Sequence, residues 1–412
     1  MTRVVFLSFR LKAQDGVSVE TEKWIEIFRE WDCEVHRVAG HIPNAGANDH
    51  VLPALNFRNP QIETFTQKVF SGGKASECEG ELLQLAEAVQ TGLYEVLDEL
   101  AADVVILENV LSLPLNIPLA ISLCRYLEDR GTPSIAVHHD FFWQDKSYSN
   151  CSLDGFLTRY FPPPLPNIKH VTINEFSREE LYQRTGMTAA CIRNCFDFST
   201  VRQQDDFNTS LRSALGIRDE EVMFLQPTRV IERKGIGRSI GFVEEFAAAC
   251  GKQARLVITG PCEHKYDDDF EKLCSKASVD VLHVPNWFGN YRHQPGTETQ
   301  YDIRDAYVCS DMIIFPSIRE GFGNPVLESV VHKKPLLVSL FPSLEELHAF
   351  GFQFLILDEF AVERTIKLLD YPLLMVEMVN RNFEIGRRYF SVEVLKEQIA
   401  ELVSSLPVLD IK

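Results

Sequence analysis

The sequence predicts two successive α/β domains, each built on a parallel β-sheet with helices on both faces. Short runs of β-branched and aromatic residues alternate with helical patterns along the 412-residue chain, and this alternation is typical of parallel sheets. The alternation breaks once, near residues 192–201, and restarts after a polar stretch. Because a chain of this length is too long for one ordinary core, two domains are the expected organisation.

The first domain begins with a strand-like run at residues 3–9, RVVFLSF. A helical pattern follows from Ser18, which is a suitable N-cap because its hydroxyl can accept a hydrogen bond from a backbone N–H of the first turn. We predict that this helix buries one apolar face. Its apolar residues are Trp24, Ile27, Phe28 and Trp31, and later strands are expected at 33–38, 103–107, 134–139 and 170–174.

The second domain is expected to begin near residue 200. Its predicted strands are 222–227, 254–260, 279–285, 311–317 and 334–340, with helices at about 237–250 and 325–332 between them. The predicted bounds are 1–199 for the first domain, 200–386 for the second, and 387–412 for a closing segment in which Ser391 caps an amphipathic helix.

Composition and charge exclude several classes of protein. Lys plus Arg is 41 and Asp plus Glu is 59, so the net charge is 41 − 59 = −18. This balance disfavours a nucleic-acid coat, whose affinity rests on clustered basic residues. No apolar run reaches the roughly 20 residues of a membrane helix, and no signal-peptide pattern opens the chain. Ten scattered cysteines without a metal-binding pattern favour a reducing cytoplasm.

Two glutamates flank a glycine-rich turn after the strand at 311–317. Glu320, Gly321 and Gly323 precede Pro325, a residue favoured in the first turn of a helix. Glycines permit close approach of the backbone to a ligand, and a helix N-terminus attracts anions. Glu328, one turn into the helix, can bind a pair of hydroxyl groups. This pattern predicts a ligand site at the end of the strand, although Glu328 alone fits a solvated helix face.

Two basic residues follow the strand at 222–227. Arg229 and Lys234 lie five residues apart across a short loop, and two fixed cations beside a helix N-terminus can stabilise a diphosphate without a metal ion. Taken alone, they fit exposed surface charges better, and the downstream glutamates make the site role the preferred interpretation. The acidic run at 267–269 is expected to be a solvated helix start and not a metal site.

In this order, Arg229, Lys234 and the segment from Glu320 to Glu328 resemble the retaining sugar-nucleotide glycosyltransferases of family 4. The resemblance implies the GT-B fold, with two Rossmann-like lobes facing a central cleft and a C-terminal helix returning to the first lobe. It covers nearly the whole chain, and the segments 15–24 and 138–143 resemble, more weakly, synthases of small soluble glycosides such as mannosylglucosylglycerate. Other matching segments are 173–181, 192–198 and 387–391.

The resemblance implies the role of each matched residue. Arg229 and Lys234 would hold the diphosphate, Glu328 the ribose hydroxyls, and Glu320 the donor sugar. His139 would lie near the reacting centre. The remaining implied substrate-binding residues are Gly16, Asn109, Asp140, Gly321, Phe322, Gly323 and Asn324.

Departures from the family pattern leave some alternatives open. Pro227-Thr228 and Cys195 replace glycines of the family, and Gly16 stands where the family has two glycines. His138 and His139 also fit strand-end histidines bonded to backbone; the site role is the preferred interpretation for His139, and the strand-end role for His138. Asp140 fits a loop-orienting or histidine-orienting role. Asn109 and Asn116 fit caps of the next helix, and Phe141 to Trp143 fit either a sugar-stacking surface or core.

The predicted function is retaining transfer of a hexose, glucose or mannose, from a nucleoside diphosphate sugar to a small hydroxylated acceptor, with anionic acceptors included. We expect no cofactor, no obligatory divalent metal, no nucleic-acid partner and no stable membrane insertion. Homo-oligomers remain open. The alternatives are a polysaccharide or glycolipid glycosyltransferase, or a non-catalytic protein that binds nucleotide sugars. One or more basic residues of the first domain can meet an acceptor phosphate or carboxylate, although surface solvation is the preferred interpretation for any single one: Arg10, Lys12, Arg58 and Lys68.

Overall fold

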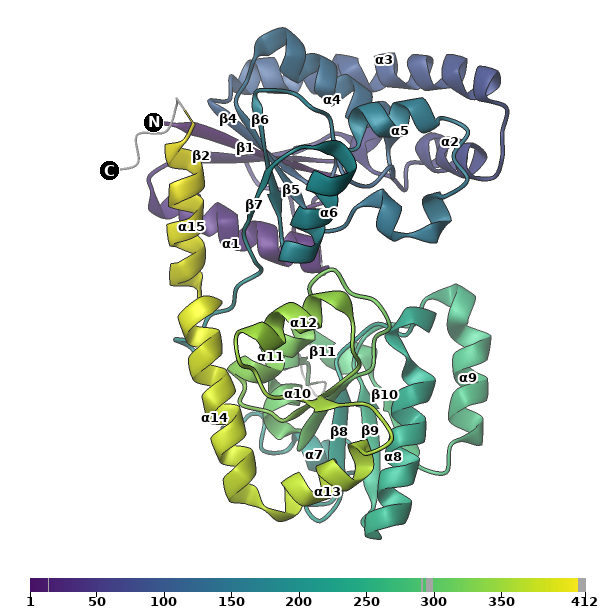
Figure 1. Ribbon diagram of the computed structural model, residues 1–412, viewed down its shortest axis with the longest axis vertical. Coiled ribbons are helices and arrows are strands. Elements are labelled where there is room, and N and C mark those ends of the chain that lie inside the picture. Colours follow the sequence, from purple (N-terminus) through teal and green to yellow (C-terminus); the bar gives the residue numbers. More distant parts are fainter. Residues whose placement is uncertain (14, 290–291, 294–298, 407–412) are drawn as a thin grey trace. The chain divides into compact units, whose positions relative to one another are not determined.

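The computed structural model describes residues 1–13, 15–289, 292–293 and 299–406 and divides the chain into two compact units (Figure 1). The first unit comprises Met1–Asn194 and Leu395–Lys412, and the second comprises Cys195–Val394. The boundary predicted at 199/200 lies in the same irregular segment, between the last strand of the first unit and the first helix of the second.

The sheet of the first unit has seven parallel strands in the order β3-β2-β1-β4-β5-β6-β7. The chain builds outward from β1 to β3 and then crosses to β4, so the strand order reverses between β1 and β4. In open parallel sheets, ligands bind beyond the carboxyl ends of the strands at such a point. The strands are β1 (Arg3–Ser8), β2 (Glu34–Ala39), β3 (Asp49–Val51), β4 (Val104–Glu108), β5 (Ser134–His138), β6 (Ile168–Thr172) and β7 (Ala189–Cys191).

Alternate side chains of β1 point to opposite faces of this sheet. Phe6 packs edge-on against Phe28 of α1, at 5.7 Å between ring centroids, whereas Val5 and Leu7 join the core made with α2 to α5. The helices are α1 (Gly16–Glu30), α2 (Pro60–Phe70), α3 (Ala75–Leu100), α4 (Ile117–Arg130), α5 (Asp154–Tyr160) and α6 (Glu175–Thr185), with short 3₁₀ turns at Pro53–Leu55, Phe142–Gln144 and Lys146–Tyr148.

The sheet of the second unit has six parallel strands in the order β10-β9-β8-β13-β14-β15. The strand order reverses between β8 and β13, which are therefore the strands expected to position a ligand. The strands are β8 (Val222–Gln226), β9 (Ala254–Ile258), β10 (Asp280–His283), β13 (Met312–Phe315), β14 (Leu336–Val338) and β15 (Leu355–Ile356), and a separate pair is formed by β11 (Phe288–Gly289) and β12 (Tyr301–Asp302).

The core of the second unit is rich in phenylalanine. Phe224 of β8 packs edge-on against Phe246 of α8 at 5.0 Å and against Phe242 at 5.8 Å. The helices are α7 (Leu211–Ala214), α8 (Ile236–Cys250), α9 (Asp267–Lys276), α10 (Ile303–Cys309), α11 (Asn324–Val331), α12 (Pro342–Ala349), α13 (Ala361–Asp370) and α14 (Pro372–Tyr389), with 3₁₀ turns at Glu232–Lys234, His264–Tyr266 and Pro285–Trp287.

The closing helix α15 (Val392–Ser404) belongs for most of its length to the first unit. Lys396 of this helix donates a hydrogen bond to Glu30 at the end of α1, at 2.6 Å. At its start, the Ser391 hydroxyl lies 3.5 Å from the Val394 backbone N–H, in the capping position that the sequence predicts. The two parallel-sheet units and the returning helix agree with the predicted fold class.

The predicted cap of α1 was wrong. Asp15, and not Ser18, is the N-cap, because its carboxylate accepts a hydrogen bond from the Ser18 backbone N–H at 3.1 Å. Ser18 instead lies inside the first turn and is buried. The acidic run Asp267 to Asp269 forms the first turn of α9, as expected.

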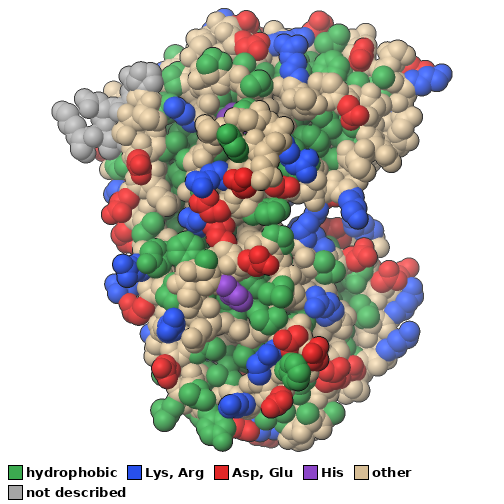
Figure 2. Space-filling model, viewed as in Figure 1, with side chains coloured by type: hydrophobic (Ala, Val, Ile, Leu, Met, Phe, Trp, Pro, Cys, Tyr) green, Lys and Arg blue, Asp and Glu red, His purple; other side chains and the backbone are tan. Residues whose placement is uncertain are grey.

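No helix among the described residues combines the length and the apolar character needed to cross a membrane. On the face displayed in Figure 2, basic and acidic side chains are interspersed over the surface.

Candidate functional site

The loops that follow β8 and β13 meet where the strand order of the second unit reverses. Lys234 of the first loop and Glu320 of the second are joined by an ion pair of 2.5 Å between Nζ and Oε1, and both side chains are about nine-tenths buried. Gly235 makes this approach possible: its φ is +65°, and a Cβ there would lie 2.7 Å from the Pro316 carbonyl oxygen. Two residues predicted for the site are therefore held together by tertiary structure.

The Lys234 ammonium is held on several sides. It lies 5.1 Å from the centroid of the Phe315 ring, and the Gln226 side-chain amide donates to the Lys234 carbonyl at 2.9 Å. Arg233 reaches the same Glu320 oxygen at 3.2 Å. Burial lowers the pKa of Lys234, while the Glu320 carboxylate acts in the opposite direction. The ammonium group is therefore held in place, and any further negative charge nearby would stabilise its protonated form.

Arg229 lies on the same loop but has a different partner. Its guanidinium forms an ion pair with Glu263 at 3.1 Å and is about half exposed. The family glycine before this arginine is absent, and the close approach is provided instead by Gly260, where a Cβ would lie 2.3 Å from the Thr228 carbonyl oxygen. Burial is the largest cause that lowers the pKa of Lys234, and the charge of Arg229 also lowers it. The two cations therefore share one electrostatic environment.

The turn from Gly321 to Asn324 leads directly into α11. Gly323 is the N-cap residue with a φ of +88°, and a Cβ there would lie 3.1 Å from the Phe341 ring. Both facts favour glycine at this position. The Phe322 side chain is buried and lies near Phe390. It therefore belongs to the core, and only backbone groups at this position remain for a ligand.

Glu328 on α11 is oriented by a partner that sequence analysis missed. The hydroxyl of the fully buried Tyr307 donates to Glu328 Oε2, and burial, followed by the Glu328 charge, raises the pKa of Tyr307 well above its usual value. The phenol therefore stays neutral and keeps its proton for Glu328. His332 stacks on Tyr307 at 5.0 Å and donates from Nδ1 to the Glu328 carbonyl at 2.8 Å. No sequence pattern distinguishes Tyr307 from an ordinary core residue.

We expect Tyr307→Phe to weaken nucleotide binding about tenfold, because it removes the hydrogen bond that orients Glu328 and leaves the ring packing intact. The measurement is the Kd of nucleoside diphosphates by calorimetry. Tyr301→Phe is the matched control, since that hydroxyl lies 3.5 Å from Ser210. Equal affinities of wild type and Tyr307→Phe would contradict this role.

In the first unit, the carboxyl ends of β4 and β5 carry a buried carboxylate–imidazole pair. Glu108 Oε2 lies 3.2 Å from His139 Nε2. The ring of His139 thus bonds a carboxylate, not backbone as one alternative had it. Sequence analysis missed Glu108, although an acid that ends the apolar strand 104–108 is a detectable signal. Asn116, not Asn109, caps α4.

The neighbouring predictions have mixed outcomes. His138 is buried and hydrogen-bonded to His170 at 2.9 Å, and burial lowers its pKa well below the usual range, followed by the effect of His170. This neutral pair is structural. Phe141 is fully buried and stacked on Trp143 at 4.4 Å, so it belongs to the core. Asp140 and Gly16 are exposed, and Gly16 is the first residue of α1.

Two arginines of the first unit converge on one aromatic ring. The guanidinium carbons of Arg10 and Arg58 lie 5.5 and 5.6 Å from the centroid of Phe57. Arg10 follows β1, and it is also paired with Asp15 at 2.9 Å. Arg58 is exposed and paired with Glu63 at 2.9 Å. The other two basic residues considered, Lys12 and Lys68, form ion pairs with Asp49 and Glu81.

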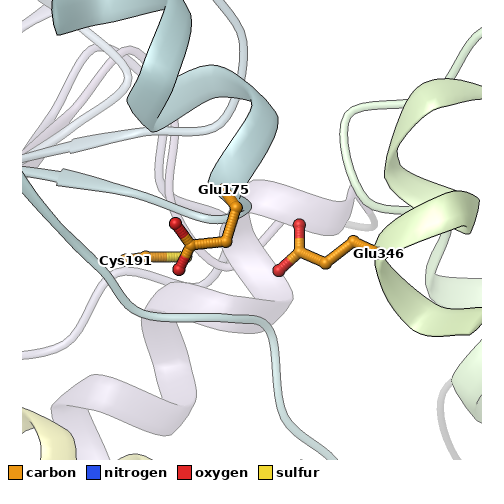
Figure 3. Close-up of side chains that lie close together, drawn as sticks. All are labelled: Glu175, Cys191 and Glu346. Atoms are coloured by element: carbon orange, nitrogen blue, oxygen red, sulfur yellow. The ribbon is translucent and has the colours of Figure 1, made fainter. Parts of the chain in front are cut away.

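Figure 3 draws the three side chains that come closest to a metal-binding set among the described residues: Glu175, Cys191 and Glu346. Glu175 and Cys191 belong to the first unit and Glu346 to α12 of the second. Because one unit alone supplies only two of these ligands, we assign no metal centre to them.

Comparison with known proteins gives consistent results. Residues 207–382 match the family described as "Glycosyl transferases group 1". The chain is 30% identical to the mannosylglucosylglycerate synthase of Petrotoga mobilis over 81% of each chain. It is 28% identical to that of Thermotoga maritima, over 97% of this chain and 99% of the relative.

Solved structures show the same fold. Anabaena HepE in complex with UDP and glucose superposes with a TM-score of 0.69 at 15% identity, covering 98% of this chain and all of that one. Sucrose-phosphate synthase from Thermosynechococcus elongatus gives 0.68 at 14% identity, covering 98% and 99%.

The two parallel-sheet units and these structural neighbours define a GT-B protein. The chain belongs to the group 1 glycosyltransferases, and it is a glycosyltransferase related to the mannosylglucosylglycerate synthases.

Proposed function

We propose that this enzyme transfers a glucosyl or mannosyl group from a nucleoside diphosphate sugar to a small anionic acceptor, with retention of anomeric configuration. The observation that carries the proposal is the buried contact between Lys234 and Glu320, where the strand order of the second unit reverses. The related synthases of Petrotoga and Thermotoga make a glycerate glycoside, as their names state, and HepE binds UDP and glucose. Both facts agree with this assignment.

The second unit has the groups to stabilise a departing diphosphate. Arg229, Lys234 and the N-terminus of α11 supply positive charge that needs no reorganisation during the reaction. Glu328, oriented by Tyr307, would bind the ribose hydroxyls. Glu320 and the backbone from Gly321 to Asn324 would hold the donor sugar. Because these protein cations would balance the leaving-group charge, we propose that no divalent metal is required.

The test is a panel of UDP-, GDP- and ADP-glucose and -mannose, assayed with and without EDTA. We expect one donor to raise the thermal stability of the protein. Without an acceptor this donor should be hydrolysed slowly, and with a hydroxylated carboxylate acceptor it should be consumed faster. Loss of activity with EDTA would contradict the metal-independent mechanism. Binding without hydrolysis or transfer would contradict the enzymatic assignment for this pocket.

The acceptor class is inferred from Arg10 and Arg58. In a chain with a net charge of −18, two guanidinium groups meet around Phe57 in the loops that follow β1 and β3. Guanidinium groups bind carboxylates in a planar, two-point geometry, and an aromatic ring packed against them restricts their motion. We therefore place the carboxylate of the acceptor there.

We expect Arg10→Ala and Arg58→Ala each to raise the KM of an anionic acceptor about tenfold, through loss of one charge-assisted hydrogen bond. The KM of the donor should not change. Arg130→Ala is the matched control, because Arg130 also lies over aromatic rings, Tyr94 and Tyr126, and pairs with Asp98. An unchanged acceptor KM in both variants would argue against a carboxylate site at Phe57.

A further inference from the structure

The pair formed by Glu108 and His139 is enclosed within the first unit. Glu108 is the last residue of β4 and His139 follows β5, the next strand in the sheet. The side chains are 1% and 7% exposed. The pair adjoins the point where the strand order reverses between β1 and β4, which is where an open parallel sheet holds its ligand.

Asn109 fixes the backbone on which the histidine stands. Its side-chain oxygen accepts from the His139 backbone N–H at 3.1 Å and from the Ser112 hydroxyl at 2.7 Å. Its own backbone N–H donates to the Val137 carbonyl at 2.9 Å, and its φ of +64° is a conformation that asparagine tolerates better than most residues. His139 is therefore held both at its backbone N–H and at its ring Nε2 atom.

The charges around the pair are mostly negative. Glu20 of α1 is buried and acts on both members, although Lys23 neutralises part of its charge through an ion pair of 2.5 Å. Asp140 acts on His139. Burial raises the pKa of Glu108. Burial acts to lower the pKa of His139, but the hydrogen bond and charge of Glu108 outweigh it and raise that pKa. Both shifts favour a proton retained by the pair.

The position of this proton decides what the second ring nitrogen can do. If Glu108 is ionised and His139 is charged, both ring nitrogens carry a proton. If Glu108 is protonated, it donates to Nε2, and the neutral ring then carries its proton on Nδ1. In both arrangements Nδ1 is a hydrogen-bond donor. Among the described residues, none is hydrogen-bonded to Nδ1.

We propose that Glu108 is a positioning residue that keeps a proton on His139, so that Nδ1–H donates a hydrogen bond to the sugar substrate and the ring does not act as a base. The proposal rests on the proposed function, in which the enzyme binds sugar substrates. It assigns to His139 a hydrogen bond to an oxygen of the sugar substrate. A retaining transfer in which the leaving group takes the acceptor proton needs no protein base, so the two proposals are compatible.

The direct test measures the proton without catalysis. In protein labelled with ¹⁵N-histidine, the His139 signals are identified by their loss in His139→Gln. We expect Nδ1 to remain protonated above pH 6.5, and Glu108→Gln to lower the midpoint of this titration. Titration of wild-type His139 at or below pH 6.5 would overturn the proposal even if Glu108→Gln failed to fold.

The kinetic test follows kcat against pH. Activity of wild type should fall at alkaline pH as the pair loses its proton, and Glu108→Gln should move this fall to lower pH. At pH 8 we expect Glu108→Gln to be about 10- to 100-fold slower, and at pH 6 to recover most of the difference. A structural role alone would lower activity equally at every pH, and that result would overturn the proposal.

Glu34→Gln is the matched control, since Glu34 pairs with His36 in the same unit at 3.1 Å and takes no part in the site. Its pH profile should match that of wild type. The two proposals fail separately. If no nucleotide sugar were hydrolysed or transferred, the proposed function would be refuted. If the His139 titration midpoint were the same in Glu108→Gln as in wild type, only the inference about the pair would be refuted.

Discussion

Lys234→Ala is expected to lower kcat for glycosyl transfer by about 100-fold or more, the size of effect seen when one preorganised charge stabiliser is removed. The Lys234 ammonium is about nine-tenths buried, and it is fixed by Glu320, by the face of Phe315 and by the hydrogen bond from Gln226 to its own carbonyl. A cation that is already in place can stabilise charge on the leaving diphosphate without reorganisation. Donor KM should change less than kcat.

The variant also leaves Glu320 buried beside Arg233 as its remaining cation. Removing one partner of a buried ion pair typically costs about 3–5 kcal/mol of unfolding free energy. Thermal unfolding must therefore accompany the kinetics, and the double variant Lys234→Met/Glu320→Gln should recover stability without recovering kcat. Lys252→Ala, which breaks an exposed pair with Asp370, is the control. Wild-type turnover by Lys234→Ala would refute the assigned role.

Arg229→Ala is the second variant with a large expected effect, again about 100-fold in kcat. Arg229 is half exposed and tied to Glu263, so its loss should change stability little, and the kinetic effect can be measured in a folded protein. Arg229→Lys should recover only part of the activity, because an ammonium lacks the two-point geometry by which guanidinium binds phosphate.

Lys265 provides a closely matched control. It also pairs with Glu263, at 3.5 Å, and is 84% exposed. Lys265→Ala therefore removes one positive charge from the same carboxylate and should leave kcat unchanged. If Lys265→Ala and Arg229→Ala had equal effects, the loss would come from the disturbed Glu263 and not from contact of Arg229 with the diphosphate.

Sequence analysis located the loops of the site more reliably than the partners of its residues. It placed Arg229, Lys234, Glu320 and Glu328 after strands or at a helix start, and the structure has them after β8, after β13 and on α11. It assigned the two cations a common role. Of these two cations, only Lys234 contacts Glu320, and Arg229 is bound to Glu263 instead. The second cation beside Glu320 is Arg233.

Local signals also failed where two residues competed for one function. Both Ser18 and Asp15 are favourable N-caps, and the structure uses Asp15 because its carboxylate reaches the N–H three residues on. His138 and His139 are adjacent and chemically identical. Their roles differ because successive residues point to opposite sides at a strand end, so that one meets His170 and the other Glu108.

The sequence by itself determined the fold class, the order of the elements and the loops that carry the charged residues, because hydrophobic periodicity and turn residues are local properties. Only the tertiary structure decided which side chains meet. Glu320 lies 86 residues from Lys234, His139 lies 31 from Glu108, and Glu328 lies 21 from Tyr307. The first two pairs form when the register of parallel strands aligns their carboxyl ends, and the third forms where α10 and α11 meet. No periodicity along the chain encodes either arrangement.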